Sequence, residues 1–335
     1  MKPYISLAHG DGGELAHKLI QEVFVEAFDH SDEARFDAAA IKVPSEKLAF
    51  STDSFVIQPI FFPGGNIGKL AVAGTVNDLS VSGAVPLYLS VGFIIEEGFL
   101  LEDLKEIVQS MAIEAKKAGV HIVTGDTKVV ERGSVDGLFI NTAGIGYYNS
   151  YEPEPSRIEK GDSIIVNGTI GDHGLAVMSA RDHLGIHHSV DSDCASLNHL
   201  IQAIVKEFAS VRIMRDPTRG GVATTLVEIC EDFHVHATIF EEHLPIKDEV
   251  DGACDILGFD PLYIANEGKV LFIVPSEIKE KVVDFLHQFE EGKDAAIIGE
   301  ITQIEEEIGK LYVTTPLGTL RRLHRLSNLQ LPRIC

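Results

Sequence analysis

The stretch Tyr151-Glu152-Pro153-Glu154-Pro155-Ser156 decides the fold that the sequence predicts. Its two prolines fix φ and remove two backbone donors, so neither a helix nor a central strand can run through it. Helix-like and strand-like segments are mixed on both sides of it. We therefore predict an α+β protein with one domain over residues 1–150 and a second over residues 157–316, joined by a short linker.

Hydrophobic periodicity predicts the elements of each half. Before the linker we expect helices over residues 14–28, 67–82 and 101–118, and strands over 37–43, 48–57, 86–95, 120–129 and 137–147. After the linker we expect helices over 175–184, 197–208, 221–233 and 276–289, and strands over 162–167, 270–274, 295–301 and 310–315. Residues 317–335 are predicted to form a mobile C-terminal tail.

The composition is that of an acidic globular protein. With 335 residues, of which 45% are hydrophobic, the chain can bury a sizeable core. The formal net charge of −23 argues against sequence-independent nucleic-acid binding, because that binding needs cations to meet phosphates. Any bound nucleotide would need a metal ion. We find no signal peptide and no apolar stretch that could span a bilayer, so the cytoplasm is the expected compartment.

Four acidic residues follow apolar runs in turn-prone settings. They are Asp53 in Ser51-Thr52-Asp53-Ser54, Asp78 in Val76-Asn77-Asp78-Leu79, Asp126 in Thr124-Gly125-Asp126-Thr127-Lys128 and Asp216 in Arg215-Asp216-Pro217. Such carboxylates suit Mg²⁺, which takes a few of them together with waters and phosphate oxygens. Any one of them is as often a turn or helix cap. The recurrence of the pattern favours a metal-dependent site.

Three glycine loops precede predicted helices. They are His9-Gly10-Asp11-Gly12-Gly13, Pro63-Gly64-Gly65-Asn66-Ile67-Gly68-Lys69 and Thr218-Arg219-Gly220-Gly221. The free amides of a helix N-terminus can hold phosphate, although a single glycine loop is usually only a turn. Neither the P-loop pattern nor the dinucleotide fingerprint is present. For Asp11, between the glycines of the first loop, we favour a turn former over a metal ligand.

The last residue, Cys335, is a thiol at the end of an extended segment. Pro332 biases the residue before it toward β or polyproline geometry, and the twelve residues from His324 onward could span roughly 40 Å. We interpret the segment as an arm that carries a working thiol, against the simpler interpretation of a frayed terminus. The other cysteines, Cys194, Cys230 and Cys254, form no C-x-x-C pair, so neither a zinc ribbon nor a disulfide framework is supported.

Together these motifs carry a resemblance to a known family. The chain resembles the HypE family, the carbamoyl dehydratases of nickel–iron hydrogenase maturation, and more distantly the aminoimidazole ribonucleotide synthetase and selenophosphate synthetase superfamily. The matching segments are residues 50–54, 61–70, 123–130, 218–221, 265–269 and 332–335. The terminal Pro-Arg-Ile-Cys is the most specific of them, because the wider superfamily shares the ATP machinery but not this tail.

The resemblance implies an aminoimidazole ribonucleotide synthetase-like fold that forms a homodimer through its N-terminal sheet and binds ATP and Mg²⁺. By that similarity, Asp53, Asp78 and Asp216 are Mg²⁺ ligands. The implied nucleotide or catalytic contacts are Lys69, Asn77, Asp126 and Lys128. The glycine loops add Gly10, Gly12, Gly13, Thr218, Arg219 and Gly220 as nucleotide-binding candidates. The expected partners are the HypF carbamoyltransferase and the HypC–HypD complex.

The resemblance also implies a reaction. Cys335 would receive a carbamoyl group, and ATP would drive dehydration of this thiocarboxamide to a thiocyanate, which provides the cyanide ligand of the hydrogenase iron. Phosphoryl transfer makes the amide oxygen a leaving group, and a base removes the nitrogen protons. Glu267 is the first candidate for the base, with Lys128 and His9 behind it. The simpler interpretations are a solvated turn carboxylate for Glu267 and an ion pair with Asp126 for Lys128.

Two other functions stay open from the sequence alone. A related ATP-dependent enzyme that acts on a small molecule would turn over unchanged without residues 332–335. A non-catalytic assembly protein would use the nucleotide only to switch exposure of the tail, so proteolysis of the tail would follow ATP binding without ATP cleavage.

Overall fold

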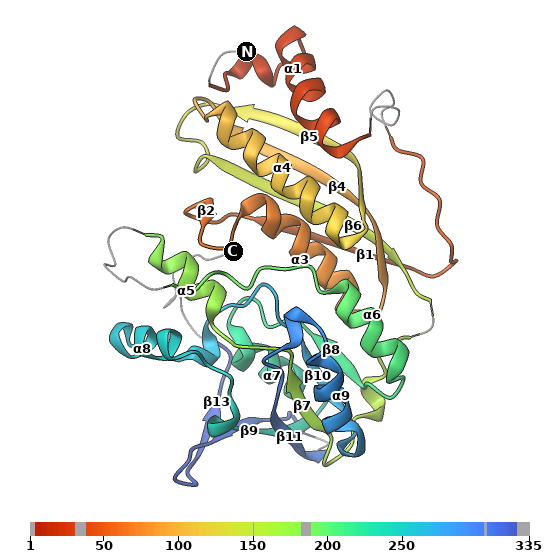
Figure 1. Cartoon of the computed structure of the whole chain (residues 1–335), viewed down its shortest axis with the longest axis vertical. Helices are drawn as coiled ribbons and strands as arrows, with labels where there is room; N and C mark the ends of the chain where they lie inside the picture. Colours follow the sequence, from red (N-terminus) through yellow and green to blue (C-terminus); the bar gives the residue numbers. More distant parts are fainter. Residues whose placement is uncertain (1–3, 31–37, 150, 182–188, 305–306, 327–335) are drawn as a thin grey trace.

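The computed structural model describes residues 4–30, 38–149, 151–181, 189–304 and 307–326 of the chain. Helices and strands form two α+β halves that stack end to end, with the N-terminal half at the top of Figure 1. Cys335 and the predicted arm from residue 327 onward lie outside the described residues. Within the described ranges, no helix is both long enough and apolar enough to cross a membrane.

A four-stranded sheet in the order β1-β6-β4-β5 forms the centre of the N-terminal half, as far as the structure describes it. Its strands are β1 (Leu48–Phe55), β4 (Val85–Glu96), β5 (His121–Val130) and β6 (Leu138–Tyr147). β4 and β5 are parallel, while the other two pairings are antiparallel. Helices α3 (Ile67–Val81) and α4 (Leu101–Ala118) lie together on the sheet (Figure 1). The strands β1 and β5 are therefore opposite edges of this sheet.

The helices predicted over 67–82 and 101–118 are confirmed, and local sequence explains their ends. The Asn66 side chain caps α3, because its Oδ1 accepts hydrogen bonds from the amides of Gly68 and Lys69 at 2.9 and 3.1 Å. α4 ends at Gly119, whose φ of +71° is the left-handed conformation that favours glycine. Helix α3 is buried on almost every side along its length, as expected for a helix that is apolar all round.

The N-terminal segment differs from its prediction in two places. The helix predicted over 14–28 is present as α1 (Glu14–Leu19), a π-helical turn η2 (Ile20–Val25) and α2 (Glu26–Phe28). The strand predicted over 37–43 is wrong over its described part, because residues 38–43 have no strand. Among the described residues, β1, the strand that follows this stretch, pairs with β6, and no strand pairs with residues 38–43. The short hairpin β2 (Phe61–Phe62) and β3 (Gly65–Asn66) leads into α3.

A sheet of seven strands, in the order β13-β12-β9-β11-β7-β10-β8, forms the described C-terminal half. The strands are β7 (Ser163–Val166), β8 (Ile213–Arg215), β9 (Val235–Phe240), β10 (Leu271–Val274), β11 (Ala296–Ile304), β12 (Leu311–Thr314) and β13 (Leu320–Leu323). The helices are α5 (Asp172–Ser179), α6 (Asn198–Glu207), α7 (Gly221–Asp232), α8 (Asp248–Leu257) and α9 (Lys279–Leu286). Strands β8 and β9 and helix α8 were not predicted from the sequence.

Helices cover both faces of this second sheet. Along β10, Leu271 and Ile273 belong to the apolar cluster that contains α7, while Phe272 and Val274 belong to the cluster that contains α6 and α9. Successive side chains of a strand point to opposite faces, so a run of buried residues identifies a strand covered on both sides. The four-residue apolar strands β7 and β10, both predicted, follow this rule.

The C-terminal sheet extends into the tail that was predicted to begin at residue 317. Leu320–Leu323 forms β13, which pairs antiparallel with β12. Ion pairs hold the basic stretch to the acidic domain: Arg321 Nη2 lies 2.9 Å from Asp260 Oδ2, and Arg325 Nη2 lies 2.7 Å from Glu231 Oε2. The described chain ends shortly after these contacts.

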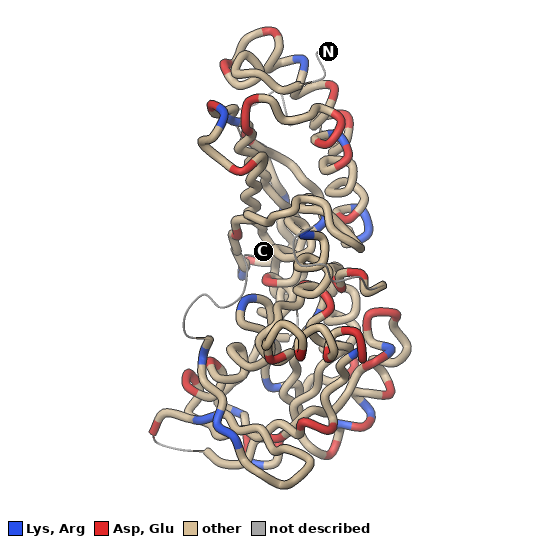
Figure 2. Tube along the Cα trace, turned by 90° about the vertical axis from the view of Figure 1, so that its left-hand side faces the viewer, with Lys and Arg blue, Asp and Glu red and all other residues tan. Residues whose placement is uncertain are grey.

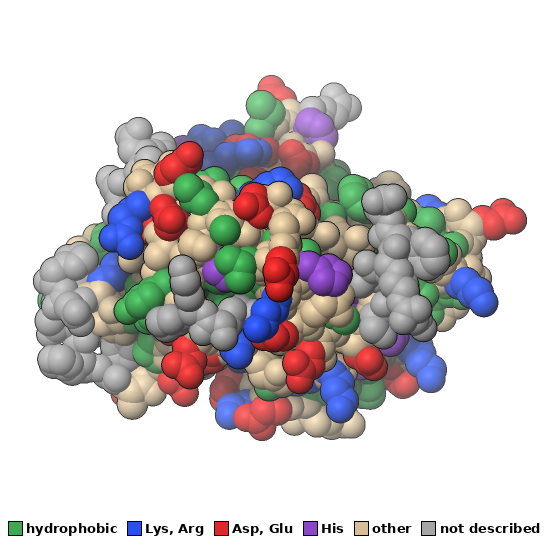
Figure 3. Space-filling model, turned by 90° about the horizontal axis from the view of Figure 1, so that it is seen from above, with side chains coloured by type: hydrophobic (Ala, Val, Ile, Leu, Met, Phe, Trp, Pro, Cys, Tyr) green, Lys and Arg blue, Asp and Glu red, His purple; other side chains and the backbone are tan. Residues whose placement is uncertain are grey.

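Charged side chains are spread over the molecule. Asp and Glu lie along both halves, with Lys and Arg among them (Figure 2). Seen from the N-terminal end, the surface mixes acidic, basic and hydrophobic side chains without one large field of either sign (Figure 3). The excess of acid therefore does not mark a binding site by itself.

Candidate functional site

A cavity of about 810 Å³, which we call the acidic cavity, lies between the two halves. Strand β1 and helix α3 line it from the N-terminal half, while the segment from β8 to α7 and the turn before β10 line it from the C-terminal half. The predicted site residues among its walls are Asp53, Asp78, Asp216, Thr218, Arg219 and Glu267. The fold thus gathers side chains that lie far apart in the sequence.

Local hydrogen bonds orient the two carboxylates of the N-terminal half. Ser51 Oγ donates to Asp78 Oδ2 at 2.8 Å, which links β1 to α3. The amide of Ser54 donates to Asp53 Oδ1 at 2.8 Å, and Asn141 Nδ2 donates to the backbone oxygen of Asp53 at 2.8 Å. Asp53 itself lines the acidic cavity.

Burial and mutual repulsion raise the pKa of these carboxyl groups. Burial raises the pKa of Asp78 to about 7, and the negative charges of Asp216 and Asp53 add to this increase. The pKa of Glu267 lies well above its usual range, first because of burial and then because of Asp193 and Asp216. Burial also raises the pKa of Asp216. Groups that repel one another in this way favour a bound cation.

The cavity suits Mg²⁺ that arrives with a nucleotide. Within the described ranges, no three His, Cys, Asp or Glu side chains lie close enough to hold a metal ion unaided. The carboxylates Asp53, Asp78 and Asp216 are therefore not a preformed cage. Mg²⁺ commonly keeps several waters and binds through one or two carboxylates and the phosphates of its substrate, so this oxygen set fits the ion.

A second cavity, of about 220 Å³, lies beside the edge strand β5, and we call it the edge cavity. It gathers a second set of candidate site residues. Its walls include the predicted residues His9, Gly10, Gly12, Asp126 and Lys128. Lys128 Nζ lies 3.0 Å from Asp126 Oδ2, and the two side chains are 64% and 71% exposed. The hydrogen bond from Lys128 lowers the pKa of Asp126. The simpler interpretation of Lys128, an ion pair with Asp126, is what the structure contains.

The loop that precedes α1 packs against β5. The amide of Ser6 donates to His9 Nδ1 at 3.1 Å, whereas His9 Nε2 is buried and has no hydrogen-bond partner among the described residues. Asp11 Oδ1 accepts a hydrogen bond from the Gly13 amide at 2.9 Å, as expected for a turn former. The Gly13 amide is therefore already bonded within the loop.

Two family models match the chain. The "AIR synthase related protein, N-terminal domain" model matches residues 35–148, and the "AIR synthase related protein, C-terminal domain" model matches residues 159–311. The chain is also similar to the carbamoyl dehydratase HypE of Rhizobium leguminosarum bv. viciae, with 47% identity over 334 residues that cover 99% of this chain and 95% of the relative. The chain belongs to the HypE family of carbamoyl dehydratases.

Solved structures of the HypE family share the fold. A crystal structure of the hydrogenase maturation protein HypE in complex with ATP matches with a TM-score of 0.92 and 45% identity, over 98% of this chain and 99% of that chain. A HypE–HypF complex matches with a TM-score of 0.80 and 47% identity, over 94% and 100% of the two chains. The resemblance and the fold class inferred from the sequence are confirmed.

Lys69 lies outside both cavities. Its Nζ donates to the backbone oxygen of Gly64 at 3.0 Å. The turn at Gly64 packs on Ser192, whose backbone nitrogen would lie 2.8 Å from a Cβ at position 64. Because Asn66 also caps the first amides of α3, this glycine loop does not present free amides for phosphate.

Asn77, the other candidate on α3, is buried and joins the two halves. Its Nδ2 donates to the backbone oxygens of Ala195 at 3.0 Å and Glu267 at 3.4 Å. Its Oδ1 accepts a hydrogen bond from the Leu197 amide at 2.8 Å. These bonds occupy its amide group, so the geometry supports positioning of neighbouring segments instead of nucleotide contact.

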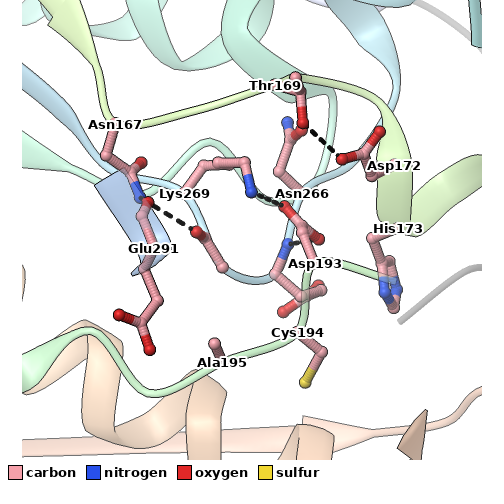
Figure 4. A network of polar contacts seen from close by, with 12 residues as sticks. Asn167, Thr169, Asp172, His173, Asp193, Cys194, Ala195, Asn266, Lys269 and Glu291 are labelled. Carbon is pink, nitrogen blue, oxygen red and sulfur yellow. Dashed lines mark hydrogen bonds and ion pairs between the residues drawn. The ribbon is translucent and has the colours of Figure 1, made fainter. Parts of the chain in front are cut away.

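A polar network that sequence reasoning missed adjoins the Glu267 turn (Figure 4). Asp193 and Lys269 form an ion pair with 3.1 Å between Oδ2 and Nζ, and Asp172 and Lys247 form another at 2.8 Å. The carboxylates of Asp193 and Asp172 are buried, and a buried charge needs a partner. Lys269 stands in the family segment 265–269, but no local pattern in the sequence distinguishes Asp193 or Lys247 from ordinary loop positions.

Proposed function

We propose that this protein dehydrates a carbamoyl group on its own Cys335, with ATP as the co-substrate, to give a thiocyanate for the cyanide ligand of a nickel–iron hydrogenase. The acidic cavity is the observation that carries the proposal, because one site combines carboxylates for a Mg²⁺–nucleotide with a buried glutamate. Phosphoryl transfer depends mainly on positioning and charge neutralisation, which such a site can supply.

In this proposal Asp53, Asp78 and Asp216 would hold Mg²⁺, which neutralises phosphate charge when bound. Thr218 and Arg219 directly precede Gly220, the N-cap of the twelve-residue helix α7, where backbone amides and a guanidinium favour phosphate oxygens. The γ-phosphoryl group passes to the oxygen of the thiocarboxamide, and the carbon–oxygen bond then breaks with release of phosphate. The lost oxygen therefore leaves in the phosphate, and the nitrogen loses both protons as the nitrile forms.

Glu267 is the group that we propose takes a nitrogen proton. It is buried and lines the cavity, so the simpler interpretation of Glu267 as a solvated turn carboxylate does not hold. The raised pKa of Glu267 makes its ionised form a stronger base than an ordinary carboxylate. A general base needs this property when it takes a proton.

The described root of the tail supports delivery of Cys335 to this cavity. The amide of Leu326 donates to Thr224 Oγ1 at 3.3 Å, on the helix α7 whose first residues follow the cavity wall. The nine residues that follow Leu326 could span roughly 30 Å when extended. Because Thr225, next to Thr224 on α7, lines the acidic cavity, this reach would let Cys335 arrive there.

We further propose a homodimer whose site is shared between subunits. Asp53 lies on edge strand β1 and Asp126 on the opposite edge strand β5, and the two line separate cavities. A second copy that pairs its sheet with this one could bring the two sets together. Phe50, which is 71% exposed, and the exposed Leu48 and Ile94 give the N-terminal sheet apolar surface that a partner would cover.

Mixing two inactive variants tests the shared site. D78N disables the acidic cavity and K128M the edge cavity, so random exchange of subunits should restore about a quarter of the wild-type sites if each site spans the dimer. Neither variant alone should be active. If the mixture stays inactive although native mass spectrometry shows mixed dimers, the site lies within one subunit.

The remaining proposals concern partners and compartment. We infer that HypF supplies the carbamoyl group and that the HypC–HypD complex accepts the cyanide, by similarity to the family. We also infer a cytoplasmic location, since Cys194, Cys230 and Cys254 are buried free thiols and a reactive Cys335 needs reducing surroundings.

The mass of the C-terminal peptide tests the function. After incubation with a carbamoyltransferase, carbamoyl phosphate and Mg-ATP, we expect a carbamoylated Cys335 that loses one water only with hydrolysable ATP. E267Q should stop at the carbamoyl adduct. The matched control is E114Q, since Glu114 and Glu267 are both 4% exposed but Glu114 lines neither cavity. A carbamoyl group that stays unchanged in the wild type would give ATP a conformational role.

A further inference from the structure

The turn that carries Glu267 is held at two points by one carboxylate. The Glu267 amide donates to Asp193 Oδ1 at 3.1 Å, and Lys269 Nζ lies 3.1 Å from Asp193 Oδ2. Figure 4 shows Lys269 and Asp193 directed toward each other from separate segments of the chain. Both oxygens of Asp193 thus bind residues that stand two apart in the turn.

Both partners of the ion pair between Asp193 and Lys269 are buried. The side chains of Asp193 and Lys269 are 2% and 9% exposed. Burial alone would raise the pKa of Asp193, but Lys269 and His173 lower it overall, so the carboxylate stays ionised. A buried ion pair of this kind contributes little net stability, whereas removing one partner leaves an uncompensated charge.

Backbone packing ties the two segments together. A Cβ at Gly268 would lie 1.8 Å from the backbone oxygen of Asp193, so the two segments of the chain touch directly. Asn77 donates to Ala195 and Glu267 from the other side. On the far end of the turn, Asn266 Nδ2 donates at 3.0 Å to the backbone oxygen of Pro217, the residue after Asp216. The turn is therefore fixed relative to α3 and to the Asp216 segment.

We propose that Asp193 is a positioning residue for the dehydration step, which places the Glu267 carboxyl group in the acidic cavity through its hydrogen bond to the Glu267 amide. Lys269 serves to neutralise Asp193. This inference rests on the proposed role of Glu267 as the base. Misplacement of a catalytic group by about 1 Å can cost up to roughly a hundredfold in rate, so a contact of this kind affects turnover.

A purely structural role for the pair predicts something different. It would lower stability on removal and leave turnover per folded molecule unchanged. The two roles are separated by variants that remove both charges together, so that no lone charge is buried, and that differ only in the acceptor for the Glu267 amide.

The experiment compares D193A/K269Q with D193N/K269Q. The asparagine keeps an oxygen that can accept the Glu267 N–H, while the alanine does not. We expect kcat for dehydration to fall about tenfold or more in D193A/K269Q, with the KM for ATP unchanged, and most of it to return in D193N/K269Q. The control is D172N/K247Q, which removes the neighbouring ion pair and should lower thermal stability without changing kcat.

The outcomes distinguish this inference from the proposed function. Turnover is taken per folded molecule, with the folded fraction read from circular dichroism. Equal kcat in the two Asp193 variants, together with an inactive E267Q, would overturn the positioning role alone. Full dehydration by E267Q would instead overturn the base assignment on which the inference rests.

Discussion

The acidic cavity and the edge cavity contain carboxylates from the same kind of sequence motif, yet their electrostatics are opposite. In the acidic cavity, burial raises the pKa of Asp78 to about 7, with Asp216 and Asp53 adding to the shift. In the edge cavity, Asp126 is exposed and the hydrogen bond from Lys128 lowers its pKa. The carboxylates of the acidic cavity repel one another, whereas Asp126 in the edge cavity is already paired with the positive charge of Lys128.

The difference shows that a motif gains its chemistry from its neighbours. Asp78 faces other carboxylates because β1, α3 and the segment after β8 meet at one place. Asp126 lies on an edge strand two residues from its own lysine. A cation that arrives with a nucleotide should therefore bind the first set, and the second set should contribute by contact with the substrate.

The largest expected effect is on ATP turnover. D78N removes a carboxylate whose pKa is raised by burial and by Asp216, and it should lower Mg²⁺-dependent phosphate release by about a hundredfold or more. D126N removes a charge that Lys128 already balances, so we expect a loss of about tenfold. Phosphate release at saturating ATP, measured across a Mg²⁺ titration, checks both. A loss in D126N as large as that in D78N would remove the distinction between the cavities.

A second, smaller effect concerns stability and pH. In the metal-free protein the folded pKa of Asp78 is about 7, above its unfolded value of 3.8, so folding is favoured while the group is protonated. This stabilisation is complete at low pH and is lost as the pH rises through 7. From pH 6 to pH 8, Asp78 should lower the free energy of unfolding by about 1.4 kcal/mol.

Urea unfolding of the wild type and D78N at the two pH values checks this expectation. The fall between pH 6 and pH 8 should be smaller in D78N by about that amount. The lowered pKa of Asp126 changes its contribution only at acidic pH, so D126N should parallel the wild type. Parallel behaviour of D78N as well would contradict the raised pKa.

Much of the fold was predictable because its helices have strong periodic patterns. The predicted apolar side of residues 101–118, with Leu104, Ile107, Val108, Met111 and Ala115, is the buried side of α4. The strand expected over 37–43 shows the limit of this approach, since its described residues have no ladder partner. The strand β13 was missed because Arg321 and Arg322 give it no apolar alternation, and its pairing with β12 and the contact to Asp260 hold it in place.

The site was predictable only in part, for a related physical reason. The apolar runs that precede Asp53, Asp78 and Asp216 marked these carboxylates, the family resemblance marked Glu267, and all four line one cavity. The turn-prone settings expected for Asp53 and Asp78 are wrong, because Asp53 lies within β1 and Asp78 within α3. Asp193 carries no such signal, because its contact with Glu267 joins positions 74 residues apart. In the same way, the hydrogen bonds of Asn77 depend on segments that only the folded chain brings to α3.

The smallest expected effect sharpens the comparison from the edge cavity. K128M removes the exposed partner of Asp126, and exposed ion pairs contribute from nearly zero to about 1 kcal/mol, so the free energy of unfolding should change by no more than that amount. D78N should instead raise stability at pH 8, because it removes a carboxylate that its neighbours repel. Urea midpoints for the two variants at pH 8 give the comparison directly. A large loss in K128M would mean that Lys128 balances more negative charge than Asp126 alone, as a partner subunit's acidic edge would supply.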